Sequence, residues 1–244
     1  MALHPSVPAV SDAPTTLVLV HGAWHGSWCW ERVAPLIERE GLAVATVDLP
    51  SVGPRKRGAG LADDAAAVGA LIDRLSGPAV LCGHSYGGMV ISHAAAARPR
   101  VAALVYLCAF MPAPGESLVS AGGNRPAPWI RVFEDGTTLP DPAQAAEVFY
   151  ADCDATTARW ALERLVPQNA AAFNEPVARP AWLATPSTYI VCAQDQAVPP
   201  EMQRAVFAPR AARVLELPAS HSPFLSQPKL LADTLAQVAS QRPV

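Results

Sequence analysis

The sequence predicts an α/β protein in which helices flank a mainly parallel sheet of six strands. Short apolar runs alternate along the chain with longer alanine-rich segments, the order of strands and helices that this class requires. The runs are apolar at consecutive positions, as strands buried on both faces are. A chain of 244 residues can form one α/β domain with one core, so residues 1–244 are expected to be a single domain.

The apolar runs and the helical segments follow one another in a regular order. The predicted strands are residues 16–20, 43–47, 79–82, 102–108, 188–192 and 213–217. The predicted helices are residues 30–40, 61–75, 86–97, 201–207 and 227–241. Pro35, Pro99 and Pro199 fall near the ends of helices, where a missing N–H group does least harm.

The alternation stops between residues 112 and 186. This stretch is rich in proline and aromatic residues, carries two predicted helices (142–153 and 156–165) and is too long for a structureless loop. An inserted helical lid is therefore expected. Its aromatic side chains line a ligand pocket or form a small core of the lid. Trp129 and Phe149, together with Trp24 from the first strand–helix loop, are the expected ligand-binding residues.

Composition excludes several classes of protein. Charged residues make up 16% of the chain and hydrophobic residues 51%, against a usual charged share of about 25%, so a disordered chain is excluded. A net charge of −3 gives no basic surface for nucleic acid. There is no apolar run of the roughly 18 residues that a membrane span needs. Residues 1–16 lack the features of a secretory signal, and a cytoplasmic protein is expected.

No metal or cofactor is predicted. The five cysteines are scattered, odd in number and include no C-x-x-C pair, which argues against a disulfide framework or a zinc cage. Only His21 and His25 have the spacing of a helical metal site, and they fall in a loop. The sequence also carries no strong signal of a protein interface.

Residues 83–88, Gly-His-Ser-Tyr-Gly-Gly, contain the motif G-x-S-x-G between a predicted strand and a predicted helix. A strand that turns sharply into a helix holds its central residue in a strained conformation, and side chains two positions away would collide. Gly83 and Gly87 avoid these collisions and leave the Ser85 hydroxyl exposed. Outside this context, the motif would be no more than a tight turn with a chance serine.

A serine needs a base to remove its proton and a third group to orient that base. In this architecture the acid and then the histidine follow the serine, each after a later strand. Asp195 follows the predicted strand 188–192, and His221 follows the strand 213–217. Glu116, after the strand 102–108, is the alternative acid. Taken singly, Asp195 is equally typical of a turn and His221 of a solvated loop.

Residues 20–26, Val-His-Gly-Ala-Trp-His-Gly, follow the first strand. Such a loop of small residues lets a backbone N–H group approach a substrate carbonyl, and with the N–H of Tyr86 it would form an oxyanion hole. The alternative is a plain glycine-rich turn.

These segments together resemble the α/β-hydrolase superfamily, in particular its branch of methylesterases, hydroxynitrile lyases and bacterial esterases. The resemblance rests on residues 21–30, the motif at 83–88, and residues 149–153, 195–199 and 221–228, so it covers nearly the whole chain from residue 17. It implies an α/β-hydrolase fold in which Ser85 is the nucleophile, His221 the base and Asp195 its orienting acid. It also implies that Ala23 and Tyr86 supply the oxyanion-hole amides.

The chain departs from this branch at informative positions. The hydroxynitrile lyases have a threonine after the first histidine and a lysine after the catalytic one, where this chain has Gly22 and Ser222. Cyanohydrin cleavage is therefore disfavoured. Tyr86 replaces a more usual leucine, and Trp24 stands where a smaller residue is common, so the pocket should be narrow or have flat aromatic walls.

The leading hypothesis is a carboxylic ester hydrolase that forms an acyl-enzyme on Ser85, acting on a methyl or aryl ester of a small or aromatic acid. The expected partner is a small-molecule ester. The same triad would also suit lactone or cyclisation chemistry in natural-product synthesis, which flat aromatic walls favour. A small-molecule receptor with slow hydrolysis is a third hypothesis, because binding and catalysis use one pocket.

Overall fold

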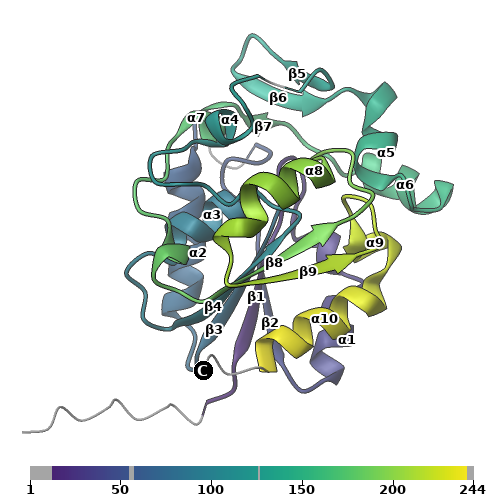
Figure 1. Ribbon diagram of the computed structural model, residues 1–244. Coiled ribbons are helices and arrows are strands. Elements are labelled where there is room, and N and C mark those ends of the chain that lie inside the picture. The colour runs from purple at the N-terminus through teal and green to yellow at the C-terminus, as the bar shows by residue number, and fades with distance from the viewer. Residues whose placement is uncertain (1–12, 55–57, 126, 241–244) are drawn as a thin grey trace, which may run out of the picture.

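A parallel, six-stranded sheet forms the centre of the protein (Figure 1). The computed structural model describes residues 13–54, 58–125 and 127–240. The strand order is β2-β1-β3-β4-β8-β9, and every neighbouring pair is parallel, as predicted. The strands are β1 (Thr16–Val20), β2 (Ala43–Val47), β3 (Ala79–His84), β4 (Val101–Leu107), β8 (Ser187–Cys192) and β9 (Arg213–Leu217).

Burial differs between the middle and the edges of this sheet. Every residue of β1, β3 and β8 is buried, which explains their uninterrupted apolar sequences. The edge strands β2 and β9 have partly exposed side chains instead. Because the strands are parallel, their carboxyl ends lie at one edge, where residues following β1, β3, β8 and β9 come together.

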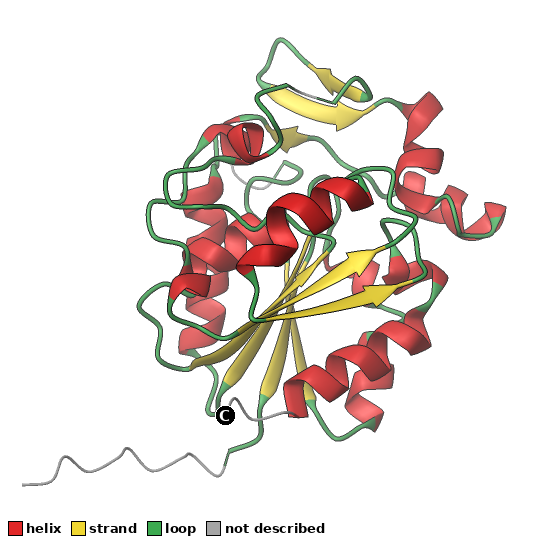
Figure 2. Cartoon of the chain, viewed as in Figure 1, coloured by secondary structure: helices red, strands yellow, loops and turns green. Residues whose placement is uncertain are grey.

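Helices cover both faces of the sheet (Figure 2). Helix α2 (Leu61–Asp73) packs against α3 (Gly87–Ala94) on one face, and α1 (Ala34–Arg39) packs against α10 (Pro228–Ser240) on the other. The shorter elements are the 3-10 turns Ser27–Trp30 and Ala208–Arg210, α8 (Pro200–Met202), the π-helical turn Gln203–Phe207 and α9 (Pro223–Ser226).

The expected helices are present but shorter or divided. Residues 30–40 form the end of a 3-10 turn and then α1, which begins just before Pro35, a residue suited to a first helical turn. Residues 201–207 begin in α8 and continue as a π-helical turn, a change of hydrogen-bond pattern that side-chain periodicity does not predict. The end of the predicted helix 227–241, residue 241, lies outside the described residues, as do residues 1–12 of the expected non-secretory N-terminus.

Segment 112–186 lies over the carboxyl edge of the sheet (Figure 1). Both predicted helices are present, as α5 (Pro142–Tyr150) and α6 (Ala155–Leu162), and each is capped by an aspartate, Asp141 and Asp154. The segment also contains a three-stranded antiparallel sheet, which the expectation of a helical lid did not include. The remaining elements are α4 (Leu118–Ala121), β5 (Ile130–Val132), β6 (Thr137–Pro140), β7 (Gln168–Asn169), α7 (Ala171–Asn174) and the 3-10 turn Ala181–Leu183.

The small sheet escaped prediction because its strands are only two to four residues long and carry no clear alternation. Only the hairpin has a local signal: Asp135 and Gly136 form its turn, where Gly136 has a φ of 79° and Asp135 Oδ1 accepts a hydrogen bond from Thr137 N at 3.0 Å. The third strand, β7, pairs with β6, where Thr138 lies opposite Gln168, and no local pattern predicts a contact between residues so far apart in the sequence.

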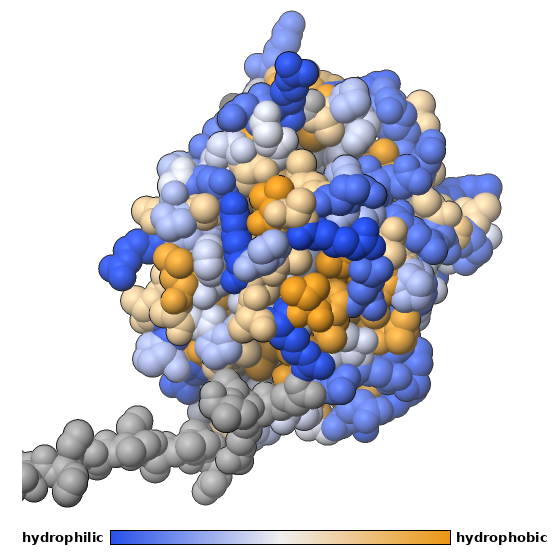
Figure 3. Space-filling model, in the orientation of Figure 1, coloured by the Kyte–Doolittle hydropathy of each residue, from blue (hydrophilic) through white to orange (hydrophobic). Residues whose placement is uncertain are grey.

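Apolar side chains on the visible surface form separate groups among hydrophilic ones (Figure 3). The large apolar residues that are exposed among the described ones are Val132, Phe133, Leu183, Val206, Val214 and Leu230. None of the described helices is long and apolar enough to cross a membrane.

Candidate active site

Ser85 lies in the sharp turn between β3 and α3. Its φ of 52° is in the left-handed region, which a serine adopts only where its surroundings hold it. Ser85 O accepts hydrogen bonds from the amides of Gly88 and Phe110, at 3.0 and 3.1 Å, and these fix the turn. A Cβ atom at Gly83 would lie 2.5 Å from Gly87 O, so only glycine fits there. The local geometry thus agrees with the expected strand–turn–helix motif.

His221 and Asp195 form a buried pair after the last two strands of the sheet. His221 Nδ1 donates a hydrogen bond to Asp195 Oδ2 over 2.7 Å, and both side chains are almost completely buried. The amides of Ala197 and Val198 donate to Asp195 Oδ1 at 2.8 and 2.9 Å. A carboxylate bound in this way fixes the imidazole as the tautomer with its proton on Nδ1, which leaves Nε2 as a proton acceptor. Glu116, the alternative acid, pairs with Arg210 at 3.0 Å.

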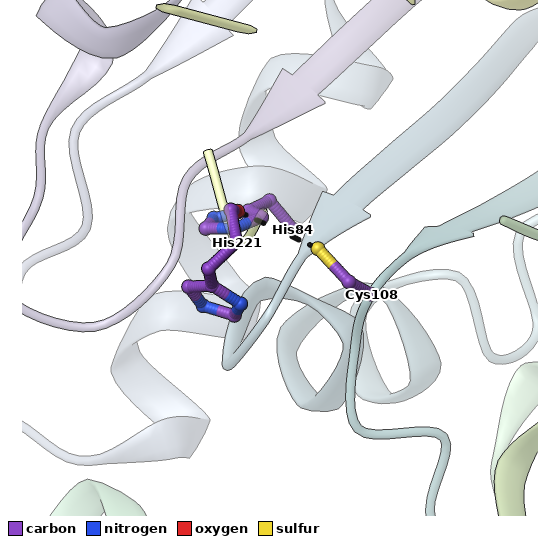
Figure 4. A group of neighbouring side chains, drawn as sticks. All are labelled: His84, Cys108 and His221. Carbon is purple, nitrogen blue, oxygen red and sulfur yellow. Dashed lines mark hydrogen bonds between the residues drawn. The ribbon is translucent and has the colours of Figure 1, made fainter. Parts of the chain in front are cut away.

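The main chain of His221 is held from below by two buried side chains. His84 Nε2 donates a hydrogen bond to His221 O at 2.8 Å, and Cys108 Sγ approaches the same oxygen at 3.6 Å (Figure 4). Possible ligand atoms of these three residues lie within 4.8 Å of one another, as in a metal site. However, burial raises the pKa of Cys108 well above its usual value, so its thiol is protonated and a poor ligand. The cluster instead positions the His221 loop.

Ser85 lies beside this pair without a hydrogen bond to it. His84, which precedes Ser85, has its ring centroid 4.6 Å from that of His221. Within the described residues, no hydrogen bond joins Ser85 Oγ to His221. The structure therefore joins two of the three predicted triad residues, His221 and Asp195, directly, and Ser85 has no hydrogen bond to them among the described residues. Catalytic hydrogen bonds often form only when substrate is bound.

Two residues that border the same cavity as Ser85 have backbone amides available for a ligand. Ala23 and Tyr86, the predicted oxyanion-hole residues, both border the cavity that Ser85 also borders. In the part of the chain that the structure describes, neither amide donates a hydrogen bond within the protein. Two unpaired N–H groups beside a serine hydroxyl suit a substrate oxygen that becomes negatively charged.

His25 and His84, two buried histidines of this region, are neutral. Burial lowers the pKa of His25 to about 3, and burial lowers that of His84 well below its usual value. His25 is also engaged at both nitrogens, by Ala23 O at 2.7 Å and by the Tyr150 hydroxyl at 2.8 Å. Neither ring therefore competes with His221 as a base near neutral pH.

A cavity of about 710 Å³ opens above Ser85, between the sheet edge and segment 112–186. Trp24, Trp129 and Phe149, the expected binding residues, all line it, and each pair of these rings lies within 6.0 Å between centroids. Phe110 and Phe173 add further aromatic wall. Apart from Arg125, the lining is uncharged, so the cavity suits a largely apolar molecule.

Other aromatic residues of segment 112–186 do not line the cavity. Trp160 packs edge-on against Trp28 and lies under the guanidinium of Arg164, while the Trp182 indole donates to Pro112 O at 2.7 Å. These residues contribute to the packing of the segment. Some aromatic residues of the segment therefore line the cavity, and others form its packed interior, as the two alternatives predicted.

Sequence reasoning missed two side chains that hold the site together. Gln203 Nε2 donates to Asp195 Oδ2 at 2.9 Å, and Gln203 Oε1 accepts from Cys192 N at 3.1 Å. Asp152 accepts hydrogen bonds from Ser220 N, at 3.0 Å, and from the Ser220 hydroxyl. Neither residue is adjacent in sequence to its partner. The sequence carries one indication that Asp152 is important: it lies within residues 149–153, one of the segments that resemble the α/β-hydrolase superfamily.

A serine in a strained strand–helix turn and a buried histidine–aspartate pair after the last two strands define a protein of the α/β-hydrolase class. The sequence shows the family directly: residues 17–234 match the alpha/beta hydrolase family, and the chain belongs to it. The predicted fold and the predicted resemblance are both confirmed.

Several relatives of this chain are named as hydrolases or esterases. It is 31% identical over 245 residues to the pyrethroid hydrolase of Sphingobium wenxiniae, covering 92% of this chain and 88% of the relative. It is 28% identical over 263 residues to methylesterase 1 of Arabidopsis thaliana, covering 92% and 95%. The crystal structure of a pyrethroid hydrolase from Sphingobium faniae matches with a TM-score of 0.77 and 28% identity, covering 93% and 98%. These relatives support the expectation of a carboxylic ester hydrolase.

Proposed function

We propose that the protein hydrolyses carboxylic esters through an acyl-enzyme on Ser85. The observation that carries the proposal is the 2.7 Å hydrogen bond between His221 and Asp195, beside a serine held at a φ of 52° under an apolar cavity. A buried carboxylate that orients an imidazole next to a strained serine is the arrangement that makes a hydroxyl nucleophilic.

The first half of the reaction forms the acyl-enzyme. His221 Nε2 takes the Ser85 proton while the serine oxygen attacks the ester carbonyl, and the amides of Ala23 and Tyr86 bind the oxyanion that develops. His221 then gives the proton to the leaving alcohol, whose bond to the carbonyl carbon breaks. Asp195 stabilises the transient imidazolium and keeps its Nδ1 proton in place.

The second half releases the acid. His221 removes a proton from water, the hydroxide attacks the acyl carbon, and the same two amides bind the second oxyanion. The proton returns to Ser85 as the acyl bond breaks. Segment 112–186 serves as a lid over the reacting groups, because its aromatic side chains form the wall of the cavity opposite the sheet.

The cavity favours esters with a bulky apolar or aromatic group. Its volume of about 710 Å³ lies in the range of sites that enclose drug-sized molecules, and its aromatic rings give it flat walls. The relatives named as a pyrethroid hydrolase and a methylesterase support this reading. Methyl and aryl esters of aromatic acids are the substrates to test first.

Cyanohydrin cleavage does not suit this site. A Cβ atom at Gly22 would lie 2.8 Å from His84 Nδ1 and 2.9 Å from the Ser85 side chain, so a threonine at that position would not fit without movement. Ser222, after His221, carries no charge, and its buried hydroxyl has no hydrogen-bond partner among the described residues. The site therefore lacks the cation that would stabilise departing cyanide.

Ser85→Ala tests the proposal. Hydrolysis of a panel of 4-nitrophenyl and methyl esters should fall by roughly 10⁴-fold or more, because the nucleophile is lost. Labelling by an aryl phosphonate, detected by mass spectrometry on the peptide that contains residue 85, should disappear. Ser92→Ala, which removes a buried serine hydroxyl from α3 outside the cavity lining, is the matched control and should keep both. Hydrolysis that survives in Ser85→Ala contradicts the proposal.

The same panel distinguishes the other hypotheses. Binding of aromatic esters without turnover in the unmodified protein would indicate a receptor. Products in which the acyl group is transferred within the substrate, as a lactone or ring, would indicate natural-product tailoring with the same triad.

A further inference from the structure

A buried chain of hydrogen bonds runs beneath the two proposed oxyanion-hole amides. It begins at Tyr86, which follows Ser85, passes through Asp64 on α2 and Ser51, and reaches Gln168 on β7. It ends at Trp24, which follows Ala23. Asp64, Ser51 and Gln168, the middle of this chain, belong neither to the proposed triad nor to the lining of the cavity.

On the Tyr86 side, the chain centres on a buried carboxylate. The Tyr86 hydroxyl donates to Asp64 Oδ2 at 2.6 Å, and the Ser51 hydroxyl donates to the same oxygen, also at 2.6 Å. The Ser51 amide donates to Asp64 Oδ1 at 2.8 Å. Asp64 is fully buried, and no described Lys, Arg or His side chain pairs with it. The carboxylate is therefore stabilised by these three hydrogen bonds, which also hold Tyr86 and Ser51 in place.

On the Trp24 side, the side-chain amide of Gln168 links Ser51 to the main chain. Gln168 Nε2 donates to the Ser51 hydroxyl at 2.9 Å, and Gln168 Oε1 accepts from Trp24 N at 3.1 Å. Gln168 is fully buried, so each of these bonds replaces one that water would make. The Trp24 indole also donates to Thr138, whose hydroxyl donates to Gln168 O at 3.1 Å.

These bonds fix the peptide between Ala23 and Trp24 from both sides. Its N–H group is held by Gln168, and its C=O group is held by His25 Nδ1 at 2.7 Å. Trp24 has a φ of 60°, an unfavourable value for a tryptophan, which must be maintained by its surroundings. The Ala23 amide belongs to the preceding peptide, so fixing the Ala23–Trp24 peptide limits how the backbone of Ala23 can move.

We infer that Asp64 and Gln168 are positioning residues, which hold the Ala23 and Tyr86 amides in the orientation that binds the oxyanion. The inference rests on the proposed function, since it concerns the same site. An oxyanion hole works because its donors are fixed before the reaction begins, and one network reaching both donor segments supplies that fixation. Gln168 comes from segment 112–186, so this segment contributes to the catalytic geometry as well as to the cavity.

Tyr86→Phe and Gln168→Leu test this inference. Tyr86→Phe removes one oxygen and leaves the residue 86 amide in place, so kcat should fall about tenfold with KM changed less than about twofold. Gln168→Leu frees the Trp24 amide and should lower kcat roughly 10- to 100-fold. Both losses stay below the roughly 100- to 1,000-fold that follows from deleting an oxyanion-hole donor itself.

The second measurement is the affinity for an aryl trifluoromethyl ketone, which forms a tetrahedral adduct with a nucleophilic serine. Its affinity should fall by the same factor as kcat/KM, while the affinity for the free aromatic acid stays within about twofold. A merely structural role would not separate these two ligands. Tyr106→Phe is the matched control, because it removes a buried tyrosine hydroxyl whose partner is Ser92 Oγ, at 2.7 Å, and which is not part of the chain of hydrogen bonds from Tyr86 to Trp24. It should keep wild-type kcat and ketone affinity.

The outcomes separate the inference from the proposed function. If Ser85→Ala is inactive but Tyr86→Phe and Gln168→Leu retain wild-type kcat and ketone affinity, the inference is wrong and the proposed function stands. If Ser85→Ala is active, the proposed function fails. Circular dichroism and thermal melting verify that each variant is folded, and should Gln168→Leu not fold, Tyr86→Phe alone decides the result.

Discussion

The carboxyl edge of the central sheet and segment 112–186 meet at one cavity but are built in opposite ways. The sheet edge carries polar groups joined by short, buried hydrogen bonds, as in the pair of His221 and Asp195. Segment 112–186 contributes mainly apolar, aromatic surface, with Trp129 and Phe149 packed edge-to-face in the cavity wall. The difference separates the proposed chemistry, which needs fixed polar atoms, from substrate choice, which needs shape.

Gln168 crosses this division. It belongs to segment 112–186, yet its side chain bonds the main chain of Trp24 in the first strand–helix loop. Changes in the two regions should therefore affect different kinetic constants, except where they disturb this connection. The following predictions test that separation, beginning with the largest expected effect.

Asp195→Asn should remove most of the activity. The asparagine fits the same space, but its amide group no longer selects the imidazole tautomer with the proton on Nδ1, so kcat should fall about 10⁴-fold with KM nearly unchanged. Steady-state kinetics on a 4-nitrophenyl ester measure both constants. Glu116→Gln is the control for the alternative acid and should keep kcat. If instead Glu116→Gln lost activity and Asp195→Asn kept it, Glu116 would be the acid that orients His221.

Asp64→Asn should change how stability depends on pH. Burial raises the pKa of Asp64 to about 6, with a smaller contribution from the nearby charge of Asp63. Because the pKa in the folded state is above the unfolded value, the favourable contribution of this group is complete below about pH 4 and is lost as the pH rises through 6. The difference is about 3 kcal/mol in the free energy of unfolding.

Urea unfolding between pH 4 and pH 7 measures this effect. The wild type should lose stability from this group across that range, and Asp64→Asn should lack that part of the slope. Asp73→Asn, at the exposed end of the same helix, should leave the slope as it is. If stability changed with pH equally in the wild type and in Asp64→Asn, the Asp64 carboxyl group would have the same pKa in the folded and unfolded protein, which contradicts the prediction.

Trp129→Ala should alter substrate choice with little effect on the chemistry. The kcat/KM for a bulky aromatic ester should fall about 10- to 30-fold, equivalent to about 1.4–2 kcal/mol of lost contact, while that for an acetate ester stays within about twofold. Trp160→Ala removes a tryptophan of the same segment that packs outside the cavity, and the ratio of the two constants should then be unchanged. A uniform loss for both esters in Trp129→Ala would contradict the separation of roles.

The sequence predicts the central sheet well because its strands carry their own signal. The limits of β1, β2 and β9 agree with the predicted ones residue for residue. Ser85, Asp195 and His221 could be chosen in advance since each directly follows such a strand, and parallel strands end at one edge. The same reasoning fails for Gln203, whose contact with Asp195 arises from a π-helical turn.

Segment 112–186 shows where local patterns stop being informative. Its two capped helices were predictable from alanine-rich runs, whereas its small sheet depends on pairing between distant residues. That pairing also buries Gln168 beside Trp24, and a single glutamine outside every predicted strand and helix gives no sign of such a role.

By itself, the amino-acid sequence determined the parallel sheet, the glycines of the strained turn and the order in which serine, aspartate and histidine follow their strands. These properties come from local sterics and hydrophobic periodicity, which act over a few residues. Tertiary structure alone decided which aromatic rings enclose the cavity and that one buried network joins Asp64 to Trp24. Such contacts depend on the folding of the whole chain, because each partner is positioned by an element far from it in sequence.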